Sequence, residues 1–130
     1  MKKYLLILTM LISMMGYSQK SSRLIAAVSY SATANYTYSP ATERIGSIQI
    51  VTSSDFAGTT GTIALKGSND GVNFSTIYAN DGVTALSFTL TAGNNTYVWE
   101  LGTVLYGTYQ LVYTAGNASA GTISATILTR

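Results

Sequence analysis

The sequence predicts an all-β protein: an antiparallel β-sandwich of about seven to nine strands, either a jelly roll or an immunoglobulin-like Greek key. Three observations lead to this class. Beyond residue 19 the chain is rich in Thr, Tyr, Ile and Val, the residue types that favour strands. Apolar residues recur at every second position, and no segment shows the period of about 3.6 residues expected of a helix. Clusters of Gly, Asn, Asp and Ser separate the segments at spacings of about 8–12 residues.

The N-terminal stretch MKKYLLILTMLISMMGYSQ is typical of an export signal. Lys2 and Lys3 form a charged start, residues 4–15 are almost wholly apolar, and a small-x-small pattern ends at Ser18. Cleavage after Ser18 would leave residues 19–130 as the β-sandwich domain. The alternative is an uncleaved membrane anchor, but a spanning helix needs about 17–25 apolar residues and this run has twelve.

Removing the signal segment, residues 1–18, balances the charges of the chain. The full sequence has seven Lys and Arg and five Asp and Glu, and two of the lysines lie in the signal segment. The remaining charged residues are Lys20, Arg23, Arg44, Lys66, Arg130, Glu43, Asp55, Asp70, Asp81 and Glu100. A net charge of zero leaves no basic patch for phosphate backbones, so we expect no nucleic-acid binding. The chain has no Cys and no His, and it therefore lacks thiolate ligands and the commonest general base.

Alternating side chains define the expected strands of the first half of the domain. Between residues 24 and 38 the even positions are apolar or aromatic, which predicts one long half-buried strand or two strands joined near Ala32. Pro40 ends this run. Residues 45–52 and 61–66 form the next two strands. Their residues expected to share a face are Ile48 with Ile50 and Ile63 with Leu65.

The second half of the domain shows the same alternation in five short segments, residues 72–78, 84–90, 97–101, 107–114 and 123–127. The residues expected to point inward are Val72, Phe74, Thr76, Tyr78, Leu86, Phe88, Leu90, Tyr97, Trp99, Leu101, Tyr109, Leu111, Tyr113, Ile123, Ala125 and Ile127. Because the connections are short, we expect most neighbouring strands to be antiparallel. The pattern leaves the order of the strands within the sheets open.

The tripeptide Asn-Asp-Gly occurs twice, with Asp70 and Asp81 eleven positions apart. Both copies fall where the chain must reverse, and Asn, Asp and Gly accept the positive φ angles of two-residue hairpin turns. A calcium site is the alternative. A strand from Val72 to Tyr78 would hold the two carboxylates about 20 Å apart, at opposite ends of a sheet, so one ion could not bridge them. We therefore expect two structural turns and no metal site.

The mature chain contains no recognisable catalytic motif. Its five carboxylates form no pair typical of a hydrolase, and no nucleophile elbow, phosphate-binding loop or zinc signature is present. Glu100 alternates with Trp99 and Leu101 and should face away from the core. We expect a protein that is not an enzyme and that holds no cofactor.

Aromatic residues offer candidate binding positions instead. Tyrosine and tryptophan combine an apolar ring with a polar edge, which suits interfaces and sugar-binding faces. The residues assigned to the core by their inward register are Tyr97, Trp99, Tyr109 and Tyr113. Tyr36, Tyr38 and Tyr106 lie near loops or strand ends, and we expect these three to contact a partner or a glycan.

Two stretches of the sequence resemble segments of small β-sandwich modules of bacteriophage virions. IALKGSNDGVNFSTI, residues 63–77, has the order strand, Gly-Ser-Asn-Asp-Gly, aromatic residue. YGTYQLVYTAGNASAGTISATI, residues 106–127, resembles their usual ending, in which a Tyr-rich strand leads to a Thr-x-Gly loop, a Gly-Thr pair and a closing strand. The resemblance covers roughly residues 28–128. These modules are capsid decoration, head-fibre and tail-associated proteins, so the resemblance implies a structural or adhesive role, with oligomerisation.

The N-terminal segment itself resembles the signal peptides of secreted Bacteroidota proteins. Three origins fit: a secreted cell-surface module related to the phage ones, a phage-encoded exported protein, or a membrane-anchored protein of a lipid-containing virus. We expect a non-enzymatic attachment protein on a virion or exported surface, such as a decoration, fibre or spike protein; the alternative is a carbohydrate-binding or adhesin-like module of a Bacteroidota cell. Expected partners are copies of the chain, other virion or surface proteins, or a glycan. A membrane would be contacted only through residues 1–18, if these stay attached.

Overall fold

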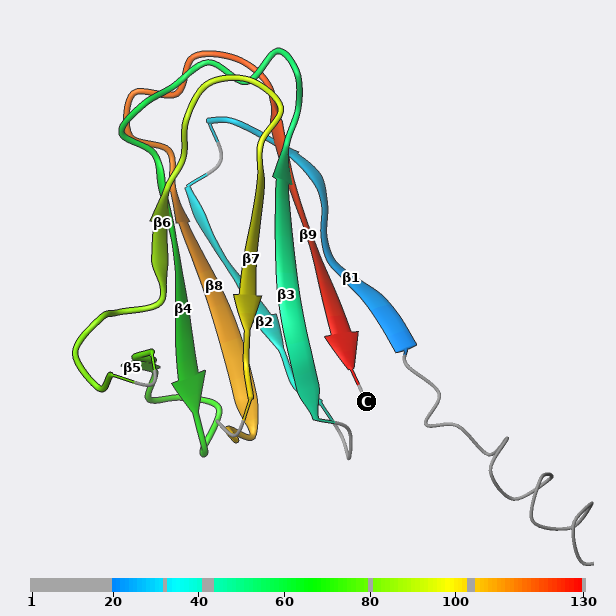
Figure 1. Ribbon diagram of the computed structural model, residues 1–130, viewed down its shortest axis with the longest axis vertical. Coiled ribbons are helices and arrows are strands. Elements are labelled where there is room, and N and C mark those ends of the chain that lie inside the picture. Colours follow the sequence, from blue (N-terminus) through cyan, green and yellow to red (C-terminus); the bar gives the residue numbers. More distant parts are fainter. Residues whose placement is uncertain (1–19, 32, 41–43, 80, 103–104, 130) are drawn as a thin grey trace, which may run out of the picture.

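The computed structural model describes residues 20–31, 33–40, 44–79, 81–102 and 105–129, with the backbone alone for 20–28. The expected signal segment, residues 1–18, and Glu43 lie outside this part. The described chain forms nine strands (Figure 1): β1 (Lys20–Ser29), β2 (Ala34–Tyr38), β3 (Ile45–Thr52), β4 (Thr62–Ser68), β5 (Ser75–Thr76), β6 (Ser87–Thr89), β7 (Thr96–Glu100), β8 (Thr108–Thr114) and β9 (Thr122–Thr129). A search of these residues finds no helix of the length and hydrophobicity that crossing a bilayer requires.

The strands form two antiparallel sheets that pack face to face (Figure 1). One sheet has the order β1-β9-β3-β7, and in the other β2, β8 and β4 are followed by β5 and β6, which both pair with β4. If β5 and β6 are counted as one interrupted strand, the first strand pairs with the last, the second with the second-last, and so on inward. This is the rolled-up hairpin of a jelly roll, so the topology decides between the two sandwich types that the sequence left open.

The core lies between the sheets and contains most of the predicted inward residues outside the 72–78 segment, together with Ile45, Phe56 and Ile77. Side chains alternate largely between buried and partly exposed along β3, β8 and β9, as expected of strands with one face on the core. The largest fully buried side chains are Tyr113, Ile48, Ile50, Ile63, Leu65, Ile77, Leu90, Leu101, Leu111, Ile123 and Ile127. Phe88 of β6 stacks on Trp99 of β7 with ring centroids 4.8 Å apart, and this contact joins the two sheets along one side.

The chain between residues 20 and 38 forms two strands rather than one. β1 ends at Ser29 and β2 begins at Ala34, and the two strands belong to different sheets. The chain therefore crosses from one layer to the other between Ser29 and Ala34. Tyr113 fixes this crossing, because its hydroxyl donates a hydrogen bond of 2.7 Å to the carbonyl oxygen of Tyr30.

The predicted strand at 72–78 is wrong. Only Ser75–Thr76 pairs with β4, and a single bridge joins Tyr78 to Ala85. The expected inward face is also reversed: Val72 is 77% exposed and Tyr78 49% exposed, whereas Ile77 is buried. The cause lies in the two Asp-Gly loops that flank this segment, whose geometry is given below.

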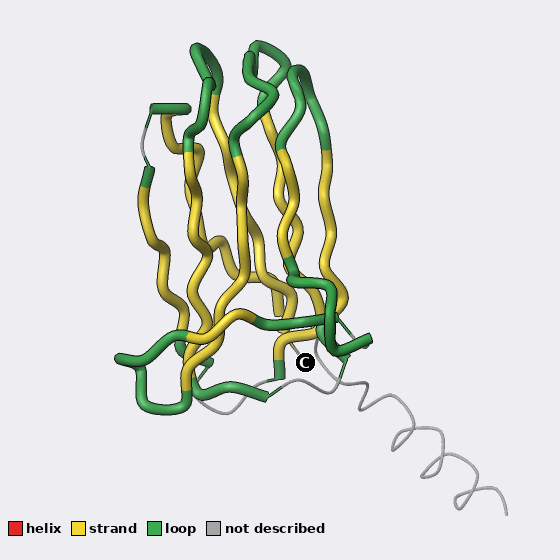
Figure 2. Tube along the Cα trace, turned by 90° about the vertical axis from the view of Figure 1, so that its left-hand side faces the viewer, coloured by secondary structure: helices red, strands yellow, loops and turns green. Residues whose placement is uncertain are grey.

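The two ends of the sandwich differ. At the upper end in Figures 1 and 2 the β3–β4 and β8–β9 loops are bonded to one another. The side-chain oxygen of Asn117 accepts hydrogen bonds from the N–H groups of Thr59 and Thr60, at 2.8 and 2.9 Å, and its own N–H donates to the Thr60 hydroxyl. The lower end carries the β4–β5 and β7–β8 connections, and the candidate site lies between them.

Candidate functional site

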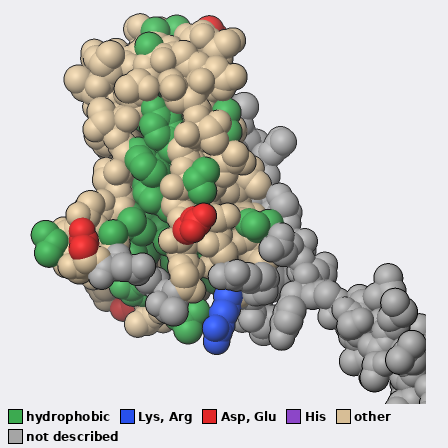
Figure 3. Space-filling view, in the orientation of Figure 1, with side chains coloured by type: hydrophobic (Ala, Val, Ile, Leu, Met, Phe, Trp, Pro, Cys, Tyr) green, Lys and Arg blue, Asp and Glu red, His purple; other side chains and the backbone are tan. Residues whose placement is uncertain are grey.

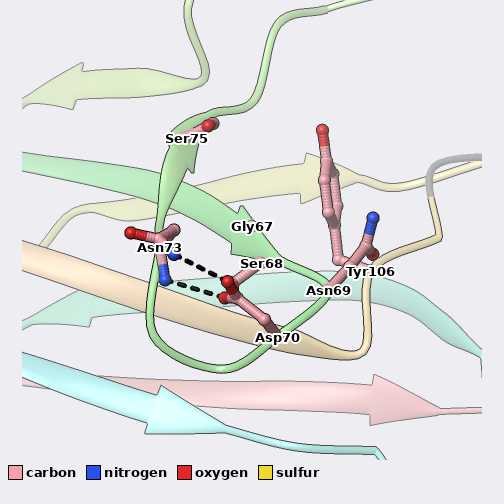
Figure 4. Close-up of a pocket in the computed structure, with 7 residues that line it drawn as sticks. All are labelled: Gly67, Ser68, Asn69, Asp70, Asn73, Ser75 and Tyr106. Atoms are coloured by element: carbon pink, nitrogen blue, oxygen red, sulfur yellow. Dashed lines mark hydrogen bonds between the residues drawn. The ribbon is translucent and has the colours of Figure 1, made fainter.

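An open hollow of about 370 Å³ lies at the lower end of the sandwich (Figure 4). It is lined by Gly67, Ser68, Asn69, Asp70, Asn73, Ser75 and Tyr106. These residues come from the end of β4, the following loop, β5 and the β7–β8 connection. The volume is near the lower limit of about 300–1,000 Å³ that is usual for small-molecule sites.

The floor of the hollow is a loop that Asp70 holds in shape. One carboxylate oxygen, Oδ1, accepts hydrogen bonds from the N–H groups of Val72 (2.9 Å) and Asn73 (2.8 Å) and from the Ser68 hydroxyl (2.7 Å). The other, Oδ2, accepts one from the Asn73 side-chain amide at 2.7 Å, as Figure 4 shows. These bonds, first that of the Asn73 N–H and next that of Ser68, hold the pKa of the Asp70 carboxyl well below its usual range.

Asp81 forms a second loop with a similar set of bonds, without a counterpart of the Ser68 bond. Its Oδ1 accepts from the N–H groups of Val83 (2.9 Å) and Thr84 (2.8 Å), and its Oδ2 accepts from the Thr84 hydroxyl. The bonds from Thr84, first from its hydroxyl and then from its backbone, lower the pKa of the Asp81 carboxyl. The repeated unit is therefore longer than Asn-Asp-Gly: it is Asn-Asp-Gly-Val followed by Asn or Thr, whose side chain supplies the last bond.

These loops correct two predictions. They are turns closed by Asp side chains, not primed hairpin turns, because within the described residues only glycines have positive φ, 72° at Gly71 and 69° at Gly82. The strand expected between them is reduced to the two-residue β5, and both loops lie in the lower half of Figure 1 rather than at opposite ends of the sheet. Each carboxylate accepts hydrogen bonds from the backbone N–H groups of the two residues after the glycine. These N–H groups are then not available to pair with a neighbouring strand, and the expected strand does not form.

Each loop presents its valine to water. Val72 is 77% exposed and Val83 is 79% exposed, and further exposed apolar side chains are Tyr78 and Leu105, at 49% and 59%. Most of the face in Figure 3 is polar, but an apolar side chain projects at the lower left, where the β5–β6 loop lies. Since hydrogen bonds fix the loops, the valines are held outward and cannot turn to the core.

Tyr106 forms one wall of the hollow. Its ring packs against Gly67, where an added Cβ would lie 2.4 Å from the nearest ring atom. It also meets Tyr109 edge to face, with centroids 5.9 Å apart, and the Tyr106 N–H donates a hydrogen bond of 3.2 Å to the Tyr109 hydroxyl. The ring is half-buried and its position is fixed from two sides.

Three polar groups of the lining are unused within the described part of the chain. The side chains of Asn69 and Ser75 and the hydroxyl of Tyr106 make no hydrogen bond to another described residue. In Figure 4 the Ser75 and Tyr106 hydroxyls stand above the Asp70 loop, with Asn69 beside the ring. All buried side-chain nitrogen and oxygen atoms of the described residues, in contrast, have partners.

Of the three tyrosines singled out from the sequence, the structure brings only Tyr106 to the hollow. Tyr36 and Tyr38 lie on β2, and both are half-buried against the core. Sequence reasoning treated Asp70 as part of a turn and missed Asn73 and Ser75. The sequence did contain a signal for the role of Asn73, because the three-residue spacing from Asp70 to Asn73 recurs between Asp81 and Thr84.

The arrangement suits binding rather than proton transfer. Both loop carboxylates accept several hydrogen bonds that favour the ionised form, which makes them poor acids and poor bases near neutral pH. Within residues 20–129, leaving out the undescribed positions, no three His, Cys, Asp or Glu side chains gather where a metal could bind.

No model of a protein family matches the sequence, and a search of curated proteins finds no match. What the chain does is therefore inferred from its own residues.

Proposed function

We propose that this chain is a non-enzymatic attachment protein that acts on a virion surface, or on the surface of the cell that exports it, in several copies. The single observation that carries the proposal is the pair of Asn-Asp-Gly-Val loops, each of which holds an exposed valine in a fixed position. Jelly rolls are common among capsid and lectin domains, which agrees with this role without proving it.

Two fixed apolar loop tips are explained best as contacts with another surface. An exposed valine favours burial, and a loop already fixed by hydrogen bonds loses little conformational entropy when it docks. Each tip is small, so one copy would bind weakly. Several linked copies raise the effective concentration and convert weak contacts into firm attachment.

The charge of the mature chain permits close packing of copies. With five basic and five acidic residues after residue 18, copies do not repel one another through net charge. We place a second copy of the chain as the first partner of the loop tips, and a host or virion protein as the next.

Native mass spectrometry and light scattering on the purified protein, together with its detection in particle and envelope fractions, test the proposal. We expect oligomers whose population falls when Val72 and Val83 are both changed to Ser. The matched control is Val98→Ser, because Val98 is also exposed, at 47%, but lies on β7 of the other sheet. A strict monomer at high concentration that is absent from particles and envelopes would contradict the proposal.

A second function, carbohydrate binding, is favoured by one observation of its own: the hollow combines the Tyr106 ring with unused polar groups.

A further inference from the structure

We infer that the hollow between the Asp70 loop and Tyr106 binds one neutral sugar unit of a glycan. The inference rests on the proposed attachment function and gives the site a ligand class. Four features of the hollow support it: its size, its aromatic wall, its unused polar groups and its charge.

The size of the hollow limits the ligand to a small unit. Its volume of about 370 Å³ is near the lower limit for small-molecule sites, and it is open to solvent on one side. A single sugar ring fits such a space, and the open side lets the rest of a glycan chain leave the site. A large flat cofactor would need a deeper cleft.

The aromatic wall offers a surface for the C–H groups of a sugar ring. Tyr106 lines the hollow, and Gly67 and Tyr109 hold its ring in place. A ring that is fixed before binding loses little side-chain freedom when a ligand packs on it. Tyr109 is 2% exposed and belongs to the core, so the wall is anchored to the rigid part of the sandwich.

The unused polar groups match the hydrogen-bonding pattern of sugar hydroxyls. The hydroxyls of Ser75 and Tyr106 both donate and accept, and the Asn69 side chain supplies an amide donor and a carbonyl acceptor. A sugar hydroxyl likewise both donates and accepts. Since these groups have no partner within the described chain, a ligand gains bonds without breaking internal ones.

The charge of the lining disfavours anionic ligands. Asp70 is its single charged residue, and a carboxylate repels phosphates and carboxylates. Calcium takes six to eight oxygen ligands and magnesium takes six, whereas the Asp70 carboxylate already accepts four hydrogen bonds from its own loop. A neutral ligand with several hydroxyls fits the otherwise uncharged polar lining.

A second hollow, of about 300 Å³, is a less suitable site for a sugar. It lies on the outer face of the β9-β3-β7 part of the first sheet and is lined by Ser47, Gln49, Val98, Thr126 and Leu128. It has no aromatic ring on which a sugar could pack. The hollow at Tyr106 is therefore the better candidate.

The test is a titration of the full chain, as isolated, with methyl glycosides of glucose, galactose, mannose and N-acetylglucosamine, followed by amide chemical shifts in NMR spectra. Inorganic phosphate is the anionic comparison. We expect at least one glycoside to shift the amides of residues 67–75 and 106 at millimolar concentration, while phosphate shifts none of them.

Two matched pairs of variants assign the contact. Asn69→Ala is compared with Asn94→Ala, an exposed asparagine in the β6–β7 loop at the other end. Tyr106→Phe, which keeps the ring and removes the hydroxyl, is compared with Tyr36→Phe. Loss of one hydrogen bond should weaken binding by roughly three- to tenfold in Asn69→Ala and Tyr106→Phe, and the controls should bind as the wild type does.

The inference is overturned if no glycoside shifts these amides, if phosphate shifts them equally, or if the paired variants bind alike. Its failure can be told apart from failure of the attachment function. Oligomers and particle association without glycoside binding would remove the sugar site alone. Glycoside binding by a strict, unattached monomer would remove the attachment function and leave the sugar site in place.

Discussion

Replacing Gly67 by alanine tests the contact on which the candidate site depends. The new Cβ would lie 2.4 Å from the nearest ring atom of Tyr106 and 2.5 Å from the root of the ring, so the whole ring must move. Overpacking of this kind costs about 1–3 kcal/mol of unfolding free energy, against a gain of roughly 0.5–1 kcal/mol for replacing a strand glycine. We expect a net loss of about 1–2 kcal/mol, measured by urea denaturation.

A double-mutant cycle with Gly67→Ala and Tyr106→Ala tests whether the loss of stability comes from the clash with the ring. In a Tyr106→Ala background the ring is gone, so Gly67→Ala should be neutral or slightly stabilising, and the coupling energy should be about 1–3 kcal/mol. Gly102→Ala is the matched control, because no atom lies within 4 Å of its added Cβ. If the effects of Gly67→Ala and Tyr106→Ala simply add, the ring does not occupy the place described, and the reasoning about the wall of the hollow is refuted.

Three further predictions concern the loops and the core. Tyr113→Phe removes the donor to the carbonyl of Tyr30 at a fully buried position, and should cost about 1–3 kcal/mol in urea denaturation; an unchanged midpoint would contradict this. Gly121→Ala should destabilise by about 1–3 kcal/mol or more, since φ is +92° there and the added Cβ would lie 2.4 Å from backbone. The folded-state pKa values of Asp70 and Asp81 are lowered, so their stabilising contribution is complete above the unfolded pKa of about 3.9 and is lost as pH falls toward the folded values. In the double variant Asp70→Asn, Asp81→Asn, the melting temperature below about pH 4 should therefore depend less on pH than in the wild type. Equal pH dependence in the two proteins would count against the loop bonds.

The strands that could be predicted from the sequence are those with one face on the core. This holds for strands between two neighbours, such as β3, β8 and β9, and for the edge strand β7: Ile48, Leu111, Ile127 and Trp99 are buried as expected. In these strands the period of two reports directly on the core. The sequence did not determine the strand order, because nothing local to a strand specifies which distant strand it pairs with.

The segment after β4 could not be predicted in the same way, because side chains there compete with the β-ladder for the backbone. Asp70 and Asp81 bind the amides that a strand would have used. The site could not be predicted for a second reason. The hollow depends on a contact between the ring of Tyr106 and Gly67, which lie on distant segments of the chain, and no local sequence pattern encodes that contact.

The duplication of the loop separates the two proposed roles. Val72 and Val83 are exposed to nearly the same extent, 77% and 79%, and in both loops the Asp Oδ1 accepts bonds from the N–H groups of the valine and of the next residue. An exposed valine next to these bonds is therefore what the two copies share. The residues of the second loop are not among those that line either hollow described above. The proposed sugar site is then a feature of the first loop alone, where Tyr106 packs beside it. A change in Asp81 should consequently affect assembly alone, whereas a change in Asp70 should affect both assembly and binding in the hollow.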